Sequence, residues 1–184
     1  MKNKFPLEPN TKIKGTELTI LDFWKWGYSD ILTNSLRGVF AEFLVGAAIG
    51  ALNQSRIEWD AFDLQYKDKK VEVKSAAYIQ AWYNGTPSKI SFSIGHKKKY
   101  DYETNTYSPD AARNADIYVF CLLKEENPEM VDPLDTSQWE FYIVLTNTLN
   151  SQFSSQKTIA LSSLKKVSAP ILYGDLRSVF DSLD

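Results

Sequence analysis

The chain has 184 residues and a formal net charge of −2, with 21 Lys and Arg against 23 Asp and Glu. This length suits one domain with its own core, and the near-neutral balance excludes a protein that attracts nucleic acid through an overall positive field. A single cysteine excludes a disulfide framework within the chain. No apolar run reaches about 18 residues and the start is unlike a signal peptide, so we expect a cytoplasmic protein with no membrane contact.

The first residues are basic, contain proline and show no periodicity. We therefore expect residues 1–18 to form an N-terminal arm and residues 19–184 to form a single domain. Aromatic residues at positions 23, 24, 26 and 28 indicate a short helix within 19–32. They could stack on unpaired bases, but packing in the core or in a dimer is the simpler interpretation.

Residues 34–53 carry apolar side chains at helical spacing and predict the longest helix, with Asn34 or Ser35 as its N-cap. Small and apolar residues also surround Glu42 on the opposite side of this helix. A buried carboxylate needs a partner. Glu42 either pairs with Arg37 or lies at a solvent-facing seam, or it points at a bound cation.

Two alternating segments, residues 61–66 and 71–76, predict a β-hairpin with a turn through residues 67–70. A turn centred between residues 68 and 69 would place Asp63 opposite Lys74. Phe62, Leu64 and Tyr66 would then share one face, while the other face would gather Asp63, Glu72 and Lys74. Asp60 competes with Asp63 as the first carboxylate, but it is expected in the entry loop.

Two carboxylates and an ammonium group at this spacing suit a hard divalent cation. Mg²⁺ prefers oxygen ligands and is commonly held by one or two carboxylates together with phosphate oxygens of the substrate. Lys74 could orient the attacking water or neutralise charge that develops on the phosphate. The hairpin therefore has the composition of a metal-assisted hydrolysis site.

The spacing of Asp63 and Glu72-Val73-Lys74, after a helix that carries a glutamate, resembles the motif of the PD-(D/E)XK nuclease superfamily. Phe62 stands where the motif's name expects proline. Longer runs are also similar to an uncharacterised bacterial group within that superfamily: DFWKWGYSDIL, RGVFAEFLVG, VEVKSAAYIQAW and DPLDTSQWEFYIVL.

The resemblance implies an α/β fold with a restriction-endonuclease-like core, in which helices flank a mixed central sheet. It further implies that Asp63 and Glu72 bind Mg²⁺ or Mn²⁺, with the Val73 carbonyl as a further ligand. Glu42 would be an additional metal ligand or a relay through bound water, and Lys74 would position the attacking water. A homodimer is also implied by resemblance.

The remaining elements are expected in chain order from the patterns of the sequence. They are a strand at 89–94, a helix at 108–114, buried strands at 116–123 and 140–145, a short helix or turn at 146–151, a strand at 157–164 and an amphipathic helix at 173–183. Cys121 is expected in the core, and Gln80 as a polar auxiliary or a surface residue.

Lys97, Lys98 and Lys99 form the densest basic run and are candidate phosphate contacts in an expected loop, 95–109, that could supply specificity. The sequence thus predicts a Mg²⁺-dependent endonuclease that hydrolyses phosphodiester bonds in DNA, with Glu42, Asp63, Glu72 and Lys74 as catalytic residues. The alternative is a module of the same fold that binds nucleic acid or protein without hydrolysis.

Overall fold

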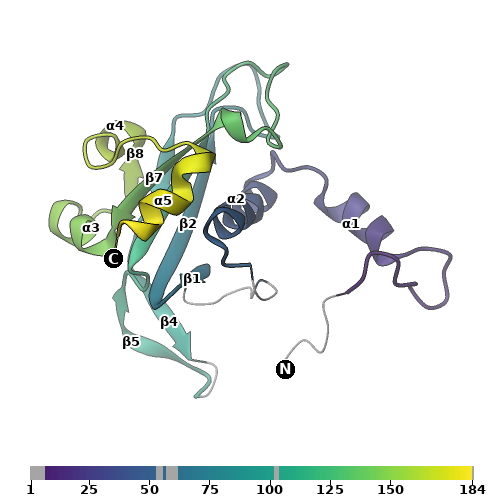
Figure 1. The fold of residues 1–184 in the computed structure, drawn as a ribbon, viewed down its shortest axis with the longest axis horizontal. Coiled ribbons are helices and arrows are strands. Elements are labelled where there is room, and N and C mark those ends of the chain that lie inside the picture. Colours follow the sequence, from purple (N-terminus) through teal and green to yellow (C-terminus); the bar gives the residue numbers. More distant parts are fainter. Residues whose placement is uncertain (1–6, 53–55, 57–61, 102–103, 184) are drawn as a thin grey trace.

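The computed structural model describes residues 7–52, 56, 62–101 and 104–183. Its centre is a four-stranded sheet with the strand order β1-β2-β6-β7 (Figure 1). The strands are β1 (Leu64–Tyr66), β2 (Lys69–Ala77), β6 (Ile117–Leu123) and β7 (Trp139–Leu145). β2 runs parallel to β6, whereas the β1–β2 and β6–β7 pairs are antiparallel. The expected α/β fold with a mixed central sheet is therefore confirmed.

Strand β6 explains why both faces of this sheet are covered. All seven of its residues, IYVFCLL, are buried, as expected for a central strand with a parallel neighbour. Alternate residues enter two separate cores: Val119 and Cys121 pack into one, Tyr118 and Phe120 into the other. The core position expected for Cys121 is confirmed, and burial raises the pKa of its thiol well above the ordinary value.

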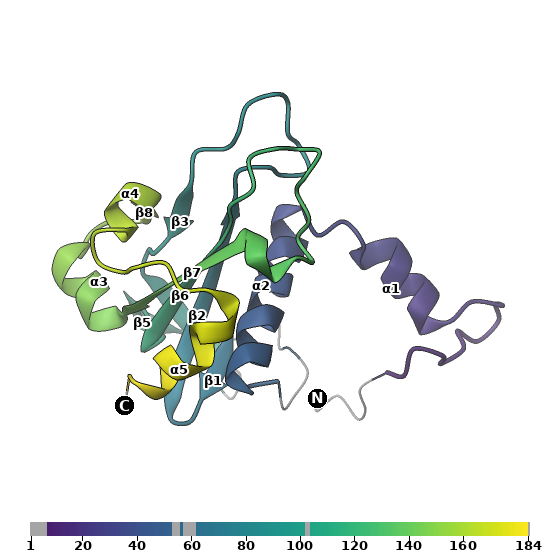
Figure 2. The ribbon, with the colours of Figure 1, turned by 45° about the horizontal axis from the view of Figure 1, so that its top comes forward.

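The first core lies between the sheet and two helices, α2 (Asn34–Ile49) and α5 (Leu176–Asp181) (Figure 2). A one-turn 3₁₀ segment, η2 (Tyr173–Asp175), precedes α5. The second core is closed by α3 (Thr146–Gln152), α4 (Leu161–Leu164) and the pair formed by β3 (Ser91–Ser93) and β8 (Thr158–Ala160). The helices that flank the sheet thus lie on both of its faces.

Helix α2 ends earlier than the sequence predicts. Its N-cap residue is Thr33 rather than Asn34 or Ser35, and its last residue is Ile49. Gly50 adopts φ +72°, the left-handed conformation that glycine accepts at a helix C-terminus. The predicted extension to residue 53 falls partly outside the described residues.

The prediction of a helix at 108–114 is wrong. The segment belongs to β5 (Thr106–Ala112), which pairs in antiparallel fashion with β4 (Lys97–Asp101). The Ser108 hydroxyl accepts a hydrogen bond from the Lys99 amide, at 2.9 Å, instead of capping a helix. Pro109 is tolerated because β5 pairs with β4 alone in the part of the chain that the structure describes, which makes it an edge strand. Lys97, Lys98 and Lys99 therefore lie on a strand, not in a loop.

The predicted strand at 157–164 is shorter, since α4 begins directly after Ala160. The predicted helix at 173–183 is divided between the 3₁₀ turn and α5. One further 3₁₀ turn, η1 (Thr136–Gln138), precedes β7.

Helix α1 (Ile20–Tyr28) begins with a capping box in which Thr19 and Asp22 bond each other's backbone amides. None of its residues is buried, and the Trp26 side chain is 85% exposed. Core packing of these aromatic residues within one chain is therefore wrong, while the homodimer stays a prediction. Among the described residues, no helix combines the length and apolarity that crossing a membrane requires.

Candidate active site

The β1–β2 hairpin has a tighter turn than its sequence suggested. Leu64 faces Val71 and Tyr66 faces Lys69, so only residues 67 and 68 lie between the strands. Lys67 adopts φ +52°, which this two-residue turn requires. The predicted register, with Asp63 opposite Lys74, is wrong by two residues.

Asp63 lies just before β1 and extends the pairing with its side chain. Its amide donates to the Val71 carbonyl at 3.0 Å, and its Oδ2 accepts the Val73 amide at 2.7 Å. The alternation of faces also breaks here, because Phe62 packs into the second core and Leu64 and Tyr66 into the first. The predicted common face for these three apolar residues is therefore wrong, and the Asp63 carboxylate is fixed against the backbone of β2.

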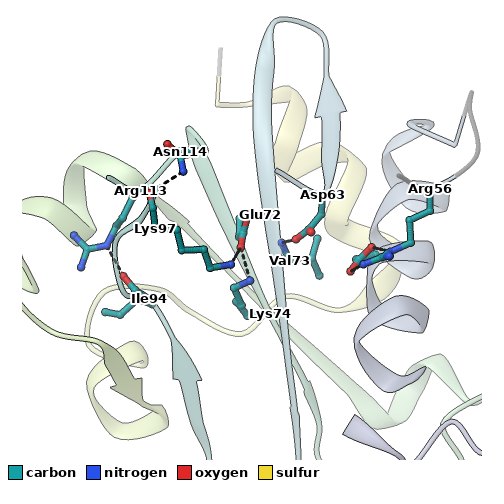
Figure 3. A network of polar contacts seen from close by, with 10 residues as sticks. Arg56, Asp63, Glu72, Val73, Lys74, Ile94, Lys97, Arg113 and Asn114 are labelled. Atoms are coloured by element: carbon teal, nitrogen blue, oxygen red, sulfur yellow. Dashed lines mark hydrogen bonds and ion pairs between the residues drawn. The ribbon is translucent and has the colours of Figure 1, made fainter. Parts of the chain in front are cut away.

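Glu72 is buried in the middle of β2 and binds two ammonium groups. Its Oε1 accepts from Lys74, two residues along the same strand, and from Lys97 Nζ at 3.0 Å. The predicted proximity of Glu72 and Lys74 is present. The contact of Lys97 was missed, since this lysine was expected only as a phosphate contact. Its side chain starts from the first residue of β4 and extends to Glu72 (Figure 3).

Glu42 lies on α2 and is only 9% exposed. Both of its oxygens accept from Arg56: Oε2 from Nε, and Oε1 from Nη2 at 3.0 Å. The predicted alternative of pairing with Arg37 is wrong, because the Arg37 guanidinium bonds Leu32 O and Asn34 Oδ1. No feature of the sequence had indicated a role for Arg56, which follows the predicted helix and precedes the predicted hairpin.

The three carboxylates lie near enough to influence one another. Burial raises the pKa of Asp63 to about 6, and the negative charges of Glu72 and Glu42 add to this effect. The ammonium of Lys74 and the hydrogen bond from the Val73 amide act in the opposite direction. In Figure 3, Asp63 lies between Glu72 on one side and Arg56 on the other. The three carboxylates thus lie close to one another at a partly buried position.

Such a set of carboxylates fits a hard divalent cation by its chemistry. Among the described residues, no three His, Cys, Asp or Glu side chains converge as a ready-made metal centre. Each carboxylate instead has a protein donor: Arg56 for Glu42, the Val73 amide for Asp63, and two lysines for Glu72. Binding of a cation to Glu72 Oε1 would therefore displace at least one lysine from that oxygen.

The other candidates take no direct part in this cluster. Gln80 donates to Ser88 Oγ at 2.8 Å, away from the carboxylates. Lys98 and Lys99 are exposed on β4, and their role as phosphate contacts stays a prediction. Asp60 lies outside the described residues.

Comparisons with known proteins place the chain in a family. A family model described as bacteriophage T4 endonuclease IV matches residues 2–163. No curated protein matches the chain. A solved structure of a bacterial homing endonuclease, I-Ssp6803I, is 16% identical, with 69% of this chain and 76% of that chain covered and a TM-score of 0.38. Since the family model spans most of its length, the chain belongs to the bacteriophage T4 endonuclease IV family.

Proposed function

We propose that the protein is a metal-dependent endonuclease of the PD-(D/E)XK type that hydrolyses phosphodiester bonds in DNA. The observation that carries this proposal is the position of Asp63 beside the Glu72-Lys74 pair on one hairpin. A chain of an endonuclease family that gathers these groups has the donors that metal-assisted phosphodiester hydrolysis needs.

Asp63 and Glu72 would hold Mg²⁺ or Mn²⁺, with Glu42 as a further ligand. When bound, the metal would polarise the phosphodiester and lower the pKa of a coordinated water. Asp63 is suited to binding because its carboxylate is kept in place by the Val73 amide. The raised pKa of Asp63 also means that a nearby positive charge would stabilise its ionised form.

Lys74 would orient the attacking water or neutralise the charge that develops on the phosphate. In this structure it shares Glu72 Oε1 with Lys97. Two ammonium groups on one carboxylate oxygen are more than neutralisation of Glu72 requires. One of them can therefore turn to substrate while the other keeps its ion pair, and Lys97 is the more exposed of the two, with 61% of its side chain accessible against 19% for Lys74.

The rival function is a module of the same fold that binds nucleic acid or protein without cleaving it. One observation favours it: Arg56, Lys74 and Lys97 neutralise Glu42 and Glu72 without any metal. In that case the charged cluster would be a structural ion-pair network, and divalent cations would leave the protein unaffected.

The deciding experiment compares the wild type, Asp63→Asn and the matched control Asp68→Asn, which removes an exposed carboxylate from the turn of the same hairpin. Thermal stability is measured in EDTA and with Mg²⁺ or Mn²⁺, and supercoiled plasmid is then added to the same samples. A cation at 100 times its Kd stabilises the folded state by about 2.7 kcal/mol.

The wild type and Asp68→Asn should both be stabilised by the cation and should nick the plasmid. Asp63→Asn should lose both responses, with nicking reduced by roughly 10³-fold or more. Stabilisation without nicking would keep the metal site and remove the nuclease assignment. A wild type that responds to neither cation would favour the binding module.

A further inference from the structure

A hollow of about 320 Å³ opens beside the carboxylate cluster. It lies between the segment that joins β3 to β4 and the loop that joins α3 to β8. Its lining is rich in cationic and hydroxyl-bearing side chains and includes no acidic residue: Ser93, His96, Lys97, Ser154, Ser155 and Lys157. These groups donate hydrogen bonds and carry positive charge, as a site for an anionic oxygen ligand requires.

Buried contacts hold the two walls of the hollow together. The Ile94 amide donates to the Lys157 carbonyl at 2.9 Å. Arg113 Nε donates to the Ile94 carbonyl at 2.7 Å, and its Nη2 donates to the Phe153 carbonyl at 2.8 Å. One guanidinium thus joins the first residue of the β3–β4 connection to the first residue of the α3–β8 loop.

Arg113 also contributes charge. It is only 7% exposed, and its acceptors are Asn150 Oδ1 at 2.7 Å and three neutral carbonyl oxygens, those of Ile94, Phe153 and Gln156. No carboxylate is among these acceptors. The positive charge of Arg113 therefore adds to that of Lys97 and Lys157, which line the hollow.

Lys97 joins the hollow to the carboxylate cluster. It lines the hollow, and its Nζ lies 3.0 Å from Glu72 Oε1. Figure 3 shows Lys97 extending from the side of Arg113 toward Glu72 and Lys74. A ligand in the hollow would consequently be separated from the proposed cleavage site only by the length of the Lys97 side chain.

We propose that this hollow, which we term the Lys157 pocket, binds a backbone phosphate that neighbours the scissile phosphate on the same DNA strand. The proposal rests on the proposed nuclease function for the identity of the polymer. Lysine ammonium groups and serine hydroxyls contact backbone phosphates without reading sequence. The Lys157 pocket would therefore hold the strand in register while the carboxylate cluster acts on the next phosphate.

The first test is binding in EDTA, where cleavage is absent. Lys157→Glu reverses a charge in the Lys157 pocket, and Lys165→Glu makes the same change at an exposed lysine outside it. The probe is a labelled 12-nucleotide DNA, single-stranded and double-stranded, at several salt concentrations. Lys157→Glu should weaken binding by about tenfold or more and lower the salt slope by about 1. Lys165→Glu should change affinity by less than about twofold, and unchanged melting temperatures would show that both variants are folded.

The second test uses His96, which is the one histidine of the chain and lines the Lys157 pocket. Its imidazole signals in an NMR spectrum need no assignment. We expect the DNA to shift them in the wild type and in Lys165→Glu, but not in Lys157→Glu. Inorganic phosphate should produce the same shift at higher concentration.

The outcomes separate the possible ligands. A shift with inorganic phosphate but none with DNA would overturn the assignment to a polynucleotide. The Lys157 pocket would be overturned if DNA bound without shifting the His96 signals and if Lys157→Glu and Lys165→Glu weakened binding equally. The nuclease proposal would still stand in that case. A His96 shift with DNA in a protein that never nicks plasmid would keep the pocket and remove only the nuclease function.

Discussion

Two regions of the molecule meet at Lys97, and they differ in how their charged groups are paired. On the side of β2, the carboxylates of Glu42 and Glu72 are each neutralised by arginine or lysine. On the side of the Lys157 pocket, the buried Arg113 bonds only neutral oxygens among the acceptors given above. The first region has anionic groups already paired with cations, whereas the second has cationic charge that its own acceptors leave uncompensated.

This difference suits a phosphodiester substrate. A cleavage site must accept a metal, so its carboxylates need partners that can be displaced, and the exposed ammonium of Lys97 is such a partner. A positioning site must accept an anion without rearrangement, and a fixed buried cation provides that. Lys97 can change from one region to the other because its ammonium reaches Glu72 while its side chain lines the pocket.

The largest expected effect tests whether Arg113 fixes the pocket. Arg113→Met would leave the carbonyls of Ile94 and Phe153 and the side chain of Asn150 without their donor. We expect the free energy of unfolding to fall by about 3–4 kcal/mol, because the buried Ile94 carbonyl would lose its donor, at a cost of about 1–3 kcal/mol, and two part-buried hydrogen bonds to a charged group would be lost as well. Denaturant unfolding gives the value.

Arg113→Lys is the matched control for charge. It keeps the cation but cannot bond three acceptors in the guanidinium geometry, so it should recover DNA affinity better than stability. A loss below 1 kcal/mol in Arg113→Met would show that the buried guanidinium does not hold the two walls, and the contrast between the two regions would fail.

The second prediction concerns the pKa of Asp63, raised from 3.8 to about 6. A raised carboxyl pKa in the folded state means that the ionised form destabilises the protein above pH 6, and that this penalty disappears as the pH falls toward 3.8. In EDTA, Asp63→Asn should therefore be more stable than the wild type at pH 7, by about 3 kcal/mol at most. The difference should shrink between pH 6 and pH 4.

Urea unfolding at four pH values between 4 and 7 measures this difference, and Asp68→Asn serves as the control with no comparable change. Adding Mg²⁺ at pH 7 should reverse the order, since the cation would stabilise the ionised wild type alone. A stability difference between Asp63→Asn and the wild type that does not vary with pH would contradict the repulsion among the carboxylates.

The third prediction compares neighbouring lysines of β4. Lys97→Ala should reduce plasmid nicking by about 10–100-fold, as expected for the loss of one charged hydrogen bond at the reacting phosphate. Lys98→Ala, for which no contact with Glu72 is present, should reduce nicking by about threefold or less. Equal effects of both substitutions would indicate that the three lysines form one diffuse basic patch. Lys97 would then have no special role as the residue that contacts both Glu72 and the Lys157 pocket.

Local patterns predicted the parts of this site that lie within one element. Glu72 and Lys74 share a face because strand geometry alternates every residue, and β6 was evident from an apolar run that a buried strand requires. The hairpin was predicted, but its predicted register was wrong. The turn could be centred on residues 67–68 or 68–69 without changing which residues alternate.

The contacts between distant elements left no local signal. Lys97 meets Glu72 across 25 positions of sequence, and the approach depends on β4, which was expected as a loop. Arg113 was assigned to a helix, and its partners are mainly backbone carbonyls, which every residue type possesses. The basic run of Lys97 to Lys99 was evident from the sequence, but the contact of Lys97 with Glu72 and the position of Arg113 follow only from the arrangement of the strands.

The smallest expected effect tests Glu42, whose partner Arg56 lies between α2 and β1 in the sequence. Arg56→Gln removes a cation whose side chain is 40% exposed from the nearly buried Glu42 but keeps one amide donor in its place, so the free energy of unfolding should fall by about 1 kcal/mol. If Glu42 is a metal ligand, Arg56 competes with the metal, and the Mg²⁺ concentration that gives half-maximal thermal stabilisation should fall several-fold. Lys12→Gln removes a cation from the exposed pair with Glu17 and controls for the change in net charge. An identical Mg²⁺ response in both variants would exclude Glu42 from the metal site and leave Asp63 and Glu72 as its carboxylates.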